Sequence, residues 1–156
     1  MPSRNVKGRI IFWKISNNHQ LKRVSVWAKL LFTWLIPNAD NLGRMEANLF
    51  IIKGMIFPLE EKITPGVCKK LLKELDKEGL IMLYQNNEND YLCMPGIVKN
   101  QKLVGNMKPV SDYPEPSKGD IERWQKETKQ VYTSSYTYIL VSAEVEGKVE
   151  GKVEGK

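Results

Sequence analysis

The sequence is poor in the residues that build most catalytic and metal sites. It contains one histidine, His19, and two cysteines, Cys68 and Cys93, which form no CxxC motif. A zinc site needs several such ligands at close spacing, and a hydrolytic triad needs a histidine held between two partners, so neither is indicated. No glycine-rich phosphate-binding motif of the P-loop or dinucleotide type occurs. The sequence therefore predicts a protein that is not an enzyme and has no catalytic, cofactor or metal site.

Features that direct a chain into or across a membrane are also missing. Every apolar run falls well short of the roughly 18 residues that a membrane span needs, and the N-terminus MPSRNVKGRIIFWKIS lacks the apolar core of a signal peptide. Two isolated cysteines without a secretory signal are typical of a reducing compartment, where they serve as small buried hydrophobic residues. We therefore expect a cytoplasmic protein with no membrane partner.

Positive charge is in excess, but it is spread unevenly. The net charge is +6. Residues 1–24 carry only basic charges, residues 25–94 are close to balance, and residues 95–118 are again basic. Basic segments on both sides of a neutral region suit a polyanion, since binding to phosphates releases counterions. They suit equally well a domain that is kept soluble by its charged ends.

The pattern of apolar and turn residues predicts a small α+β domain. Ser25, Asn48 and Thr64 are each well placed to cap a helix, and Pro65 stands at the favoured first helical position. Residues 9–16 favour extended structure because β-branched and aromatic side chains dominate there. The central elements follow in the order helix, short strand, helix, helix and β-hairpin, over residues 26–36, 44–46, 49–57, 65–79 and 80–94. This is the order of a winged helix, a helix-turn-helix with a β-hairpin wing.

The third of these helices sorts its residues by charge. On a helical wheel its apolar side chains gather on one side, and the opposite side carries Lys69, Lys70, Lys73 and Lys77, here called the lysine row. The acids Glu74, Asp76 and Glu78 fall on the flanks. In a helix-turn-helix the N-terminal half of this helix enters the major groove of DNA, which makes Thr64 and the lysine row candidate DNA contacts. The alternative is that Glu74 and Asp76 form ordinary solvated pairs with Lys70 and Lys73.

The chemistry of this helix suits phosphates better than bases. It carries no Arg, Asn or Gln, the side chains that most often make sequence-specific base contacts. Asn86 and Asn87, in the hairpin turn, are further candidates for contact with the backbone or the minor groove, although the turn itself favours asparagine. Arg4, Lys7 and Arg9 form a basic arm that could follow phosphates or enter a minor groove. Arg44 is a candidate phosphate contact, with a structural bond to Asp40 as the alternative.

Several blocks of the sequence resemble one family of proteins. These blocks include RIIFWKIS, LLFTWLIPNADNLGRMEA, IIKGMIFPL, DYLCMPG and NQKLVGNMKPVSDYPEP, and they run from about residue 9 to 116. They resemble the N-terminal winged-helix domain of phage replication proteins, the replisome organisers, which are related to DnaD-type primosome proteins. The resemblance implies binding to origin DNA during phage or prophage replication in a bacterial host, together with self-assembly into a homo-oligomer and contact with host replication proteins.

Together these patterns predict four regions and a function. A basic arm with a short strand (1–24) precedes the winged-helix domain (25–95), an extended Pro/Gly linker (96–118), and a short helix with a disordered VEGK-repeat tail (119–156). We expect double-stranded DNA as the partner and DNA replication as the process. A winged-helix transcriptional regulator, or an adaptor that binds an acidic protein surface through the lysine row, are the alternatives.

Overall fold

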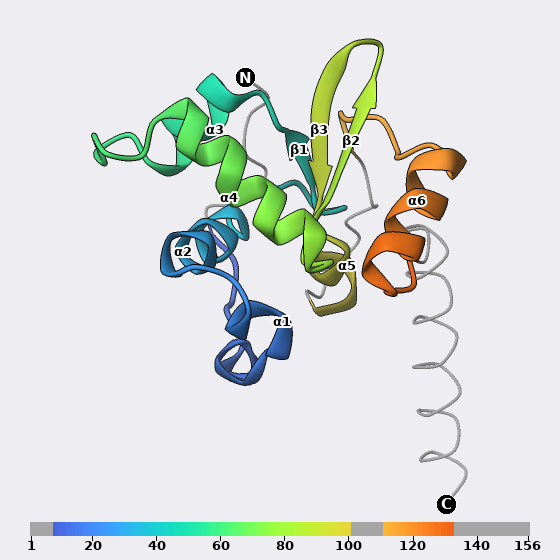
Figure 1. Ribbon diagram of the computed structural model, residues 1–156, viewed down its shortest axis with the longest axis horizontal. Helices are drawn as coiled ribbons and strands as arrows, with labels where there is room; N and C mark the ends of the chain where they lie inside the picture. The colour runs from blue at the N-terminus through green and yellow to red at the C-terminus, as the bar shows by residue number, and fades with distance from the viewer. Residues whose placement is uncertain (1–7, 101–110, 133–156) are drawn as a thin grey trace, which may run out of the picture.

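The computed structural model describes residues 8–100 and 111–132. Figure 1 shows helices on both sides of a small antiparallel sheet whose hairpin extends beyond them. The fold is therefore α+β, and its layout is compatible with that of a winged helix. The elements in order are η1 (Trp13–Asn17), α1 (His19–Lys22), α2 (Val26–Leu35), β1 (Arg44–Glu46), α3 (Leu49–Ile56), α4 (Pro65–Lys77), β2 (Met82–Asn86), β3 (Asn89–Cys93), α5 (Pro95–Asn100) and α6 (Lys118–Thr128).

The three predicted helix caps are confirmed. The Ser25 hydroxyl accepts a hydrogen bond from the Ala28 N–H at 3.3 Å. The Asn48 side chain accepts from the first turn of α3 in the same way, and Thr64 does so at α4, directly before Pro65. Because each cap satisfies an N–H group that has no partner within the helix, these short polar side chains determine where α2, α3 and α4 begin.

The sheet has the strand order β1-β3-β2, with both pairs antiparallel. The short strand at 44–46 and the hairpin are as predicted. The polar stretch QNNEND (85–90) further predicts a six-residue turn between the two strands, and this prediction is wrong. The strands continue to Asn86 and from Asn89, which pair with each other. Only Asn87 and Glu88 connect them, with φ angles of 49° and 67°. Positive φ at both positions matches a type I′ turn, whose twist suits the two strands of a hairpin.

The main core lies between α2, α3, α4 and one face of the sheet. Its most buried side chains include Leu31, Leu35, Ile52, Phe57, Leu75 and Leu92. Cys68 and Cys93 are buried free thiols, as the sequence predicts. Burial raises the pKa of the Cys93 thiol to about 12, so this side chain stays neutral.

A second apolar cluster covers the other face of the sheet and changes the predicted domain boundaries. Met82 and Tyr84 on β2, with Cys93 on β3, pack against Trp124 of α6 and Tyr132. The short helix predicted after residue 118 is present as α6, but the structure packs it against the sheet, whereas the sequence placed it outside the winged-helix domain, beyond a linker over 96–118. Residues 111–132 belong to the packed domain because they bury this sheet face. The VEGK repeat lies outside the described residues.

The N-terminal region also differs from its prediction. Residues 13–17 form η1, where the sequence favours extended structure, and the stretch NNHQLKR (17–23), whose polar composition predicts a connection, contains α1. The Asn18 side chain accepts hydrogen bonds from the N–H groups of Gln20 and Leu21, at 2.8 and 3.0 Å, which begins α1. Leu21 is buried in the main core. A local cap and one buried side chain thus outweigh the β propensity of the preceding residues.

Among the helices of residues 8–100 and 111–132, none combines the length and the apolar composition needed to span a bilayer.

Candidate nucleic-acid interface

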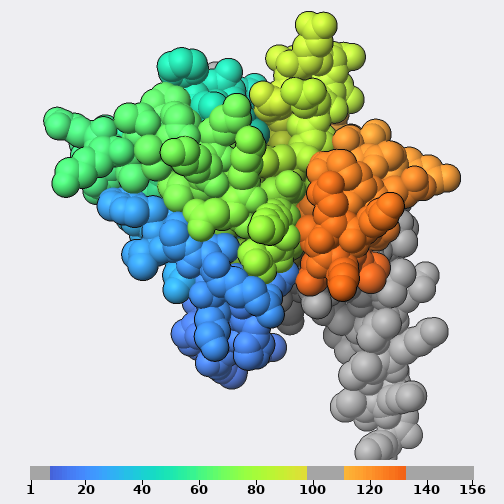
Figure 2. All heavy atoms as spheres, in the orientation of Figure 1, coloured from blue at the N-terminus to red at the C-terminus, as the bar shows by residue number. Residues whose placement is uncertain are grey.

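The lysine row lies on the solvent-exposed side of α4. Cys68, Leu71, Leu72 and Leu75 are buried on the opposite side, so the predicted wheel is confirmed in its apolar half. Lys69, Lys70, Lys73 and Lys77 are all exposed. In Figures 1 and 2, α4 runs across the front of the molecule, between α2 and the base of the hairpin. The fold therefore presents four ammonium groups along one accessible helix face.

The acids of α4 bond to other elements and not to the lysines. Glu74 accepts hydrogen bonds from the backbone N–H of Ser25 at 3.0 Å and from its hydroxyl at 2.8 Å. Asp76 accepts from the Leu83 N–H at 3.0 Å, and Glu78 pairs with Arg23 at 3.3 Å. Burial raises the pKa of the Asp76 carboxyl, and the bond from Leu83 opposes that shift.

The alternative of solvated Glu74–Lys70 and Asp76–Lys73 pairs is therefore wrong. Within the described parts of the chain, no carboxylate lies within ion-pair distance of any lysine in the row. The mixed charge of the α4 sequence becomes two spatially separate sets: acids that join α4 to α2 and β2, and lysines whose charge faces solvent. Unpaired surface ammonium groups in a row suit an extended anion.

A groove of about 430 Å³ runs between α4 and the hairpin. Its polar lining comes from Lys69 and Lys73 of α4, from Gln85 and Asp90 of the hairpin, and from Asp120 and Arg123 of α6. The apolar part of the lining comes from Ala47, Leu49, Leu72 and Leu83, with Tyr91 beside them. Half of the lysine row thus faces a groove, while Lys70 and Lys77 do not line it.

The remaining candidates, at the start of α4 and in the hairpin, are all exposed, but one of them already has a structural hydrogen bond. Thr64 is exposed, but its hydroxyl oxygen accepts the Val67 N–H at 3.2 Å as the α4 cap. Asn86 and Asn87 are exposed at the end of the hairpin. The turn conformation of Asn87 accounts for asparagine there, because this side chain tolerates positive φ better than most.

The basic arm contributes a structural residue. The Arg9 guanidinium donates to the backbone oxygens of Ile36 at 2.9 Å and Ala39 at 2.6 Å, and to Asn41 Oδ1 at 3.2 Å. Its recorded bonds are thus with the turn that follows α2, where a cation stabilises the helix C-terminus. The guanidinium of Arg9 therefore has a structural role, because it holds the N-terminal segment to the turn after α2. Arg4 and Lys7 lie outside the described residues.

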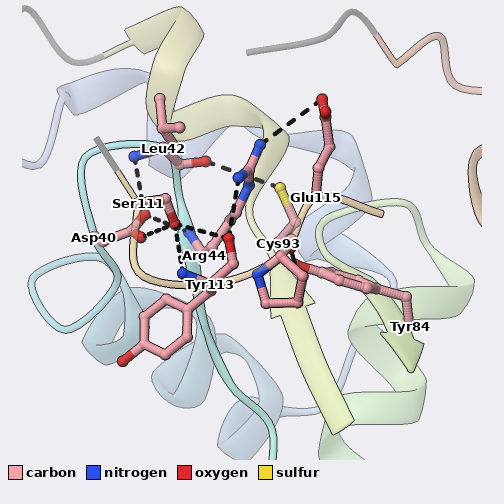
Figure 3. A network of polar contacts seen from close by, with 9 residues as sticks. Asp40, Leu42, Arg44, Tyr84, Cys93, Ser111, Tyr113 and Glu115 are labelled. Carbon is pink, nitrogen blue, oxygen red and sulfur yellow. Dashed lines mark hydrogen bonds and ion pairs between the residues drawn. The ribbon is translucent and has the colours of Figure 1, made fainter. Parts of the chain in front are cut away.

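Arg44 is a buried residue, so its prediction as a phosphate contact is wrong. It is 7 % exposed. Figure 3 shows its guanidinium between the chain segments of Tyr113 and Glu115, with bonds to the Tyr113 oxygen at 3.3 Å and the Glu115 carboxylate at 3.8 Å. The expected bond to Asp40 is made by the Arg44 backbone N–H, at 2.9 Å, and not by the side chain.

This network joins the turn before β1 to the segment before α6. The Asp40 carboxylate also accepts from the Ser111 hydroxyl, and Tyr84 donates its hydroxyl to the Pro114 oxygen at 2.7 Å (Figure 3). A cation that is almost completely removed from water needs such partners, and residues 113–115 supply two of them to Arg44. Arg44 therefore positions α6 rather than a ligand.

Sequence reasoning missed Arg123, because it placed residues 119–156 outside the domain. A signal for the docking of α6 was present in the hairpin. Met82 and Tyr84 alternate with Leu83 in β2, and Cys93 alternates with Leu92 in β3. Side chains of successive strand residues point to opposite faces, so both faces of this sheet are apolar. A sheet with two apolar faces requires a second covering element, and α6 is that element.

Comparisons with known proteins find no match to this chain. No protein-family model matches it, and neither a curated protein nor a solved structure does so. Within residues 8–100 and 111–132, no group of three or more His, Cys, Asp or Glu side chains could hold a metal ion. The lysine row and the groove beside it form an accessible surface with exposed positive charge on the described part of the chain.

Proposed function

We propose that this chain is a non-enzymatic winged-helix protein that binds duplex DNA, and that it serves the initiation of phage or prophage DNA replication in a bacterial host. One observation carries the DNA-binding part: the lysine row is exposed and unpaired, while every acid of the same helix is bonded elsewhere. The replication role and a host replication partner rest on the sequence resemblance to replisome organisers.

The arrangement supports a winged-helix mode of binding. The order α2, β1, α3, α4, β2 and β3, with sheet order β1-β3-β2, is compatible with this fold. In that fold α4 would enter the major groove, and the hairpin would lie along the neighbouring backbone. The Lys69 and Lys73 side of the groove then faces the passing phosphates. Because lysine contacts phosphates more readily than it distinguishes bases, affinity should depend strongly on salt and weakly on sequence.

Neutralising the lysine row tests this proposal. The variant Lys69→Gln/Lys70→Gln/Lys73→Gln removes three charges from α4, and binding is measured by fluorescence anisotropy with a labelled duplex over a series of salt concentrations. If each lysine contacts a phosphate, the slope of log affinity against log salt should fall by about 0.9 per lysine. Melting temperature should hardly change, because all three side chains are exposed.

A charge-matched variant provides the control. Lys14→Gln/Lys22→Gln/Lys29→Gln removes the same charge from three exposed residues of η1, α1 and α2. In Figure 1, α1 lies at the opposite end of the molecule from the hairpin, and α2 lies on the side of α4 away from it. This variant should keep most of the slope. Equal losses in the two variants would show that net charge alone drives binding. If the unmodified chain fails to bind any duplex at low salt, the DNA proposal is wrong and an adaptor role becomes the better hypothesis.

A further inference from the structure

The groove beside the lysine row is lined in part by α6, a helix that is not among the elements of the winged-helix order. Helix α6 packs against α4 and against the sheet through Trp124, and Figure 2 shows it directly beside the end of α4 and the hairpin. Two of its side chains, Asp120 and Arg123, line the groove that Lys69 and Lys73 also line. A third cation, distant in sequence, is thereby brought to the same groove.

Arg123 is both held in place and accessible. Its Nη2 donates to the Leu83 backbone oxygen at 2.8 Å, and its Nη1 pairs with the Glu127 carboxylate at 3.2 Å. The side chain nevertheless remains 42 % exposed. A guanidinium has five N–H donors, so these two bonds leave others free for an anion. A guanidinium already fixed by the protein loses little side-chain entropy when it binds a phosphate.

The carboxylates near Arg123 reduce the positive potential, but one oxygen of each groove acid is engaged in a local hydrogen bond. Asp120 accepts from the Ser117 N–H at 3.1 Å and the Ser117 hydroxyl at 2.7 Å in a capping box. Asp90 accepts from the Gln85 amide at 2.8 Å. The groove lining therefore combines three cations with two acids engaged in local bonds. Glu127 is the acid that competes directly for Arg123.

We propose that Arg123 contacts the phosphate backbone of the bound duplex, so that α6 is a third DNA-contacting element beside α4 and the hairpin. This inference rests on the proposed function. A strand that passes along Lys69 and Lys73 lies over the groove that Arg123 also lines, where the guanidinium offers charged N–H donors to phosphate oxygens. Glu127 limits this contact, since the phosphate must compete with its carboxylate.

Two charge-matched pairs of variants test the inference by the same anisotropy assay. At about 100° per residue, Glu122 and Lys126 project on the side of α6 opposite Trp124, whereas Arg123 and Glu127 share the groove flank. Arg123→Ala should weaken binding about tenfold at low salt and reduce the salt slope by about 0.9. Lys126→Ala, with the same loss of charge, should change affinity by less than about twofold.

The second pair adds charge instead of removing it and leaves Arg123 in place. Glu127→Gln frees the guanidinium and should tighten binding more than Glu122→Gln does, although both variants gain one positive charge. Circular dichroism of each variant checks that α6 remains folded. Compared with Arg123→Ala, Arg123→Lys should recover part of the slope of log affinity against log salt, because it keeps the positive charge. A purely structural role for the bond to Leu83 would not explain such a recovery.

The outcomes separate this inference from the proposed function. If the unmodified chain binds duplex DNA but Arg123→Ala equals Lys126→Ala, or Glu127→Gln equals Glu122→Gln, the α6 contact is overturned and binding through the lysine row stands. If the unmodified chain binds no duplex at all, both proposals are overturned together. If Arg123→Ala weakens binding more than Lys126→Ala does, and Glu127→Gln tightens it more than Glu122→Gln does, α6 is supported as part of the interface.

Discussion

Replacing Trp124 by alanine is the sharpest test of whether α6 belongs to the folded domain. Its indole is 1 % exposed, and its ring meets that of Tyr132 edge to face, with ring centres 6.5 Å apart. Its Nε1–H donates to the Ile81 backbone oxygen at 2.8 Å. Trp124→Ala removes this packing from the sheet face and leaves the Ile81 oxygen without that donor. The change therefore acts on the second apolar cluster and on the backbone of Ile81, which directly precedes β2.

The expected loss is large compared with the stability of a small domain. Truncating a buried tryptophan to alanine costs roughly 3–5 kcal/mol, whereas a domain of this size has a free energy of unfolding of about 5–15 kcal/mol. Trp124→Phe keeps most of the apolar contact but loses the indole donor, so we expect about 1–2 kcal/mol. Val131 is 83 % exposed on the same segment, and Val131→Ala should stay within about 0.5 kcal/mol of the unmodified chain.

Urea unfolding followed by far-ultraviolet circular dichroism measures these differences. If α6 unfolds cooperatively with the rest, Trp124→Ala lowers the midpoint of a single transition and leaves its slope unchanged. The reasoning is refuted if Trp124→Ala costs less than about 1 kcal/mol, or no more than Val131→Ala, since a side chain with these contacts could not then be part of the core. A lower slope with an unchanged midpoint would show instead that α6 detaches by itself.

Two further predictions concern a turn and a buried carboxylate. Gly43 has a φ of +75°, and a Cβ there would collide with the Met94 backbone oxygen, so Gly43→Ala should cost about 2 kcal/mol or more in urea unfolding. Gly54→Ala, in open space on α3, should stabilise by roughly 0.5–1 kcal/mol in the same assay, and equal signs for the two variants would contradict this reasoning. Burial raises the pKa of the Asp76 carboxyl above its ordinary value, so the folded chain binds this proton more tightly than the unfolded chain does. That contribution to stability is present at low pH and is lost as pH rises through the folded pKa. Asp76→Asn keeps an acceptor for the Leu83 N–H but does not titrate. As pH rises from the unfolded to the folded pKa of Asp76, the urea midpoint of the variant should therefore increase relative to that of the unmodified chain. A difference between the two midpoints that does not change with pH would disprove the raised pKa of Asp76.

Much of the domain follows from short-range patterns. The caps at Ser25, Asn48 and Thr64 act within three residues of themselves, and the apolar spacing of α4 depends only on helical geometry. The exposure of the lysine row follows from the same geometry, since the side opposite a buried stripe faces solvent. Such features can be predicted from the sequence because each depends on neighbours along the chain.

The partners of charged residues could not be predicted in this way. Glu74 bonds to Ser25 across 49 positions of the chain, and Arg44 bonds to Tyr113 across 69. A sequence pattern shows that these groups are charged, but it does not show which distant donor or acceptor lies beside them. The sequence therefore left two interpretations open for Arg44, a phosphate contact or a structural bond to Asp40, and two for the acids of α4, which could flank the lysine row or pair with it.

The order of the central helices and strands, the buried face of α4 and the lysine row opposite it can be read from the chain alone, because they depend on local periodicity and on capping. The bonds of the α4 acids to the segments around α2 and β2, and the packing of α6 that closes the second face of the sheet and brings Arg123 to the groove, arise only when the chain folds. These outcomes depend on which surfaces meet when the chain is compact, and burial of both faces of one small sheet is what brings residues 111–132 back onto the domain.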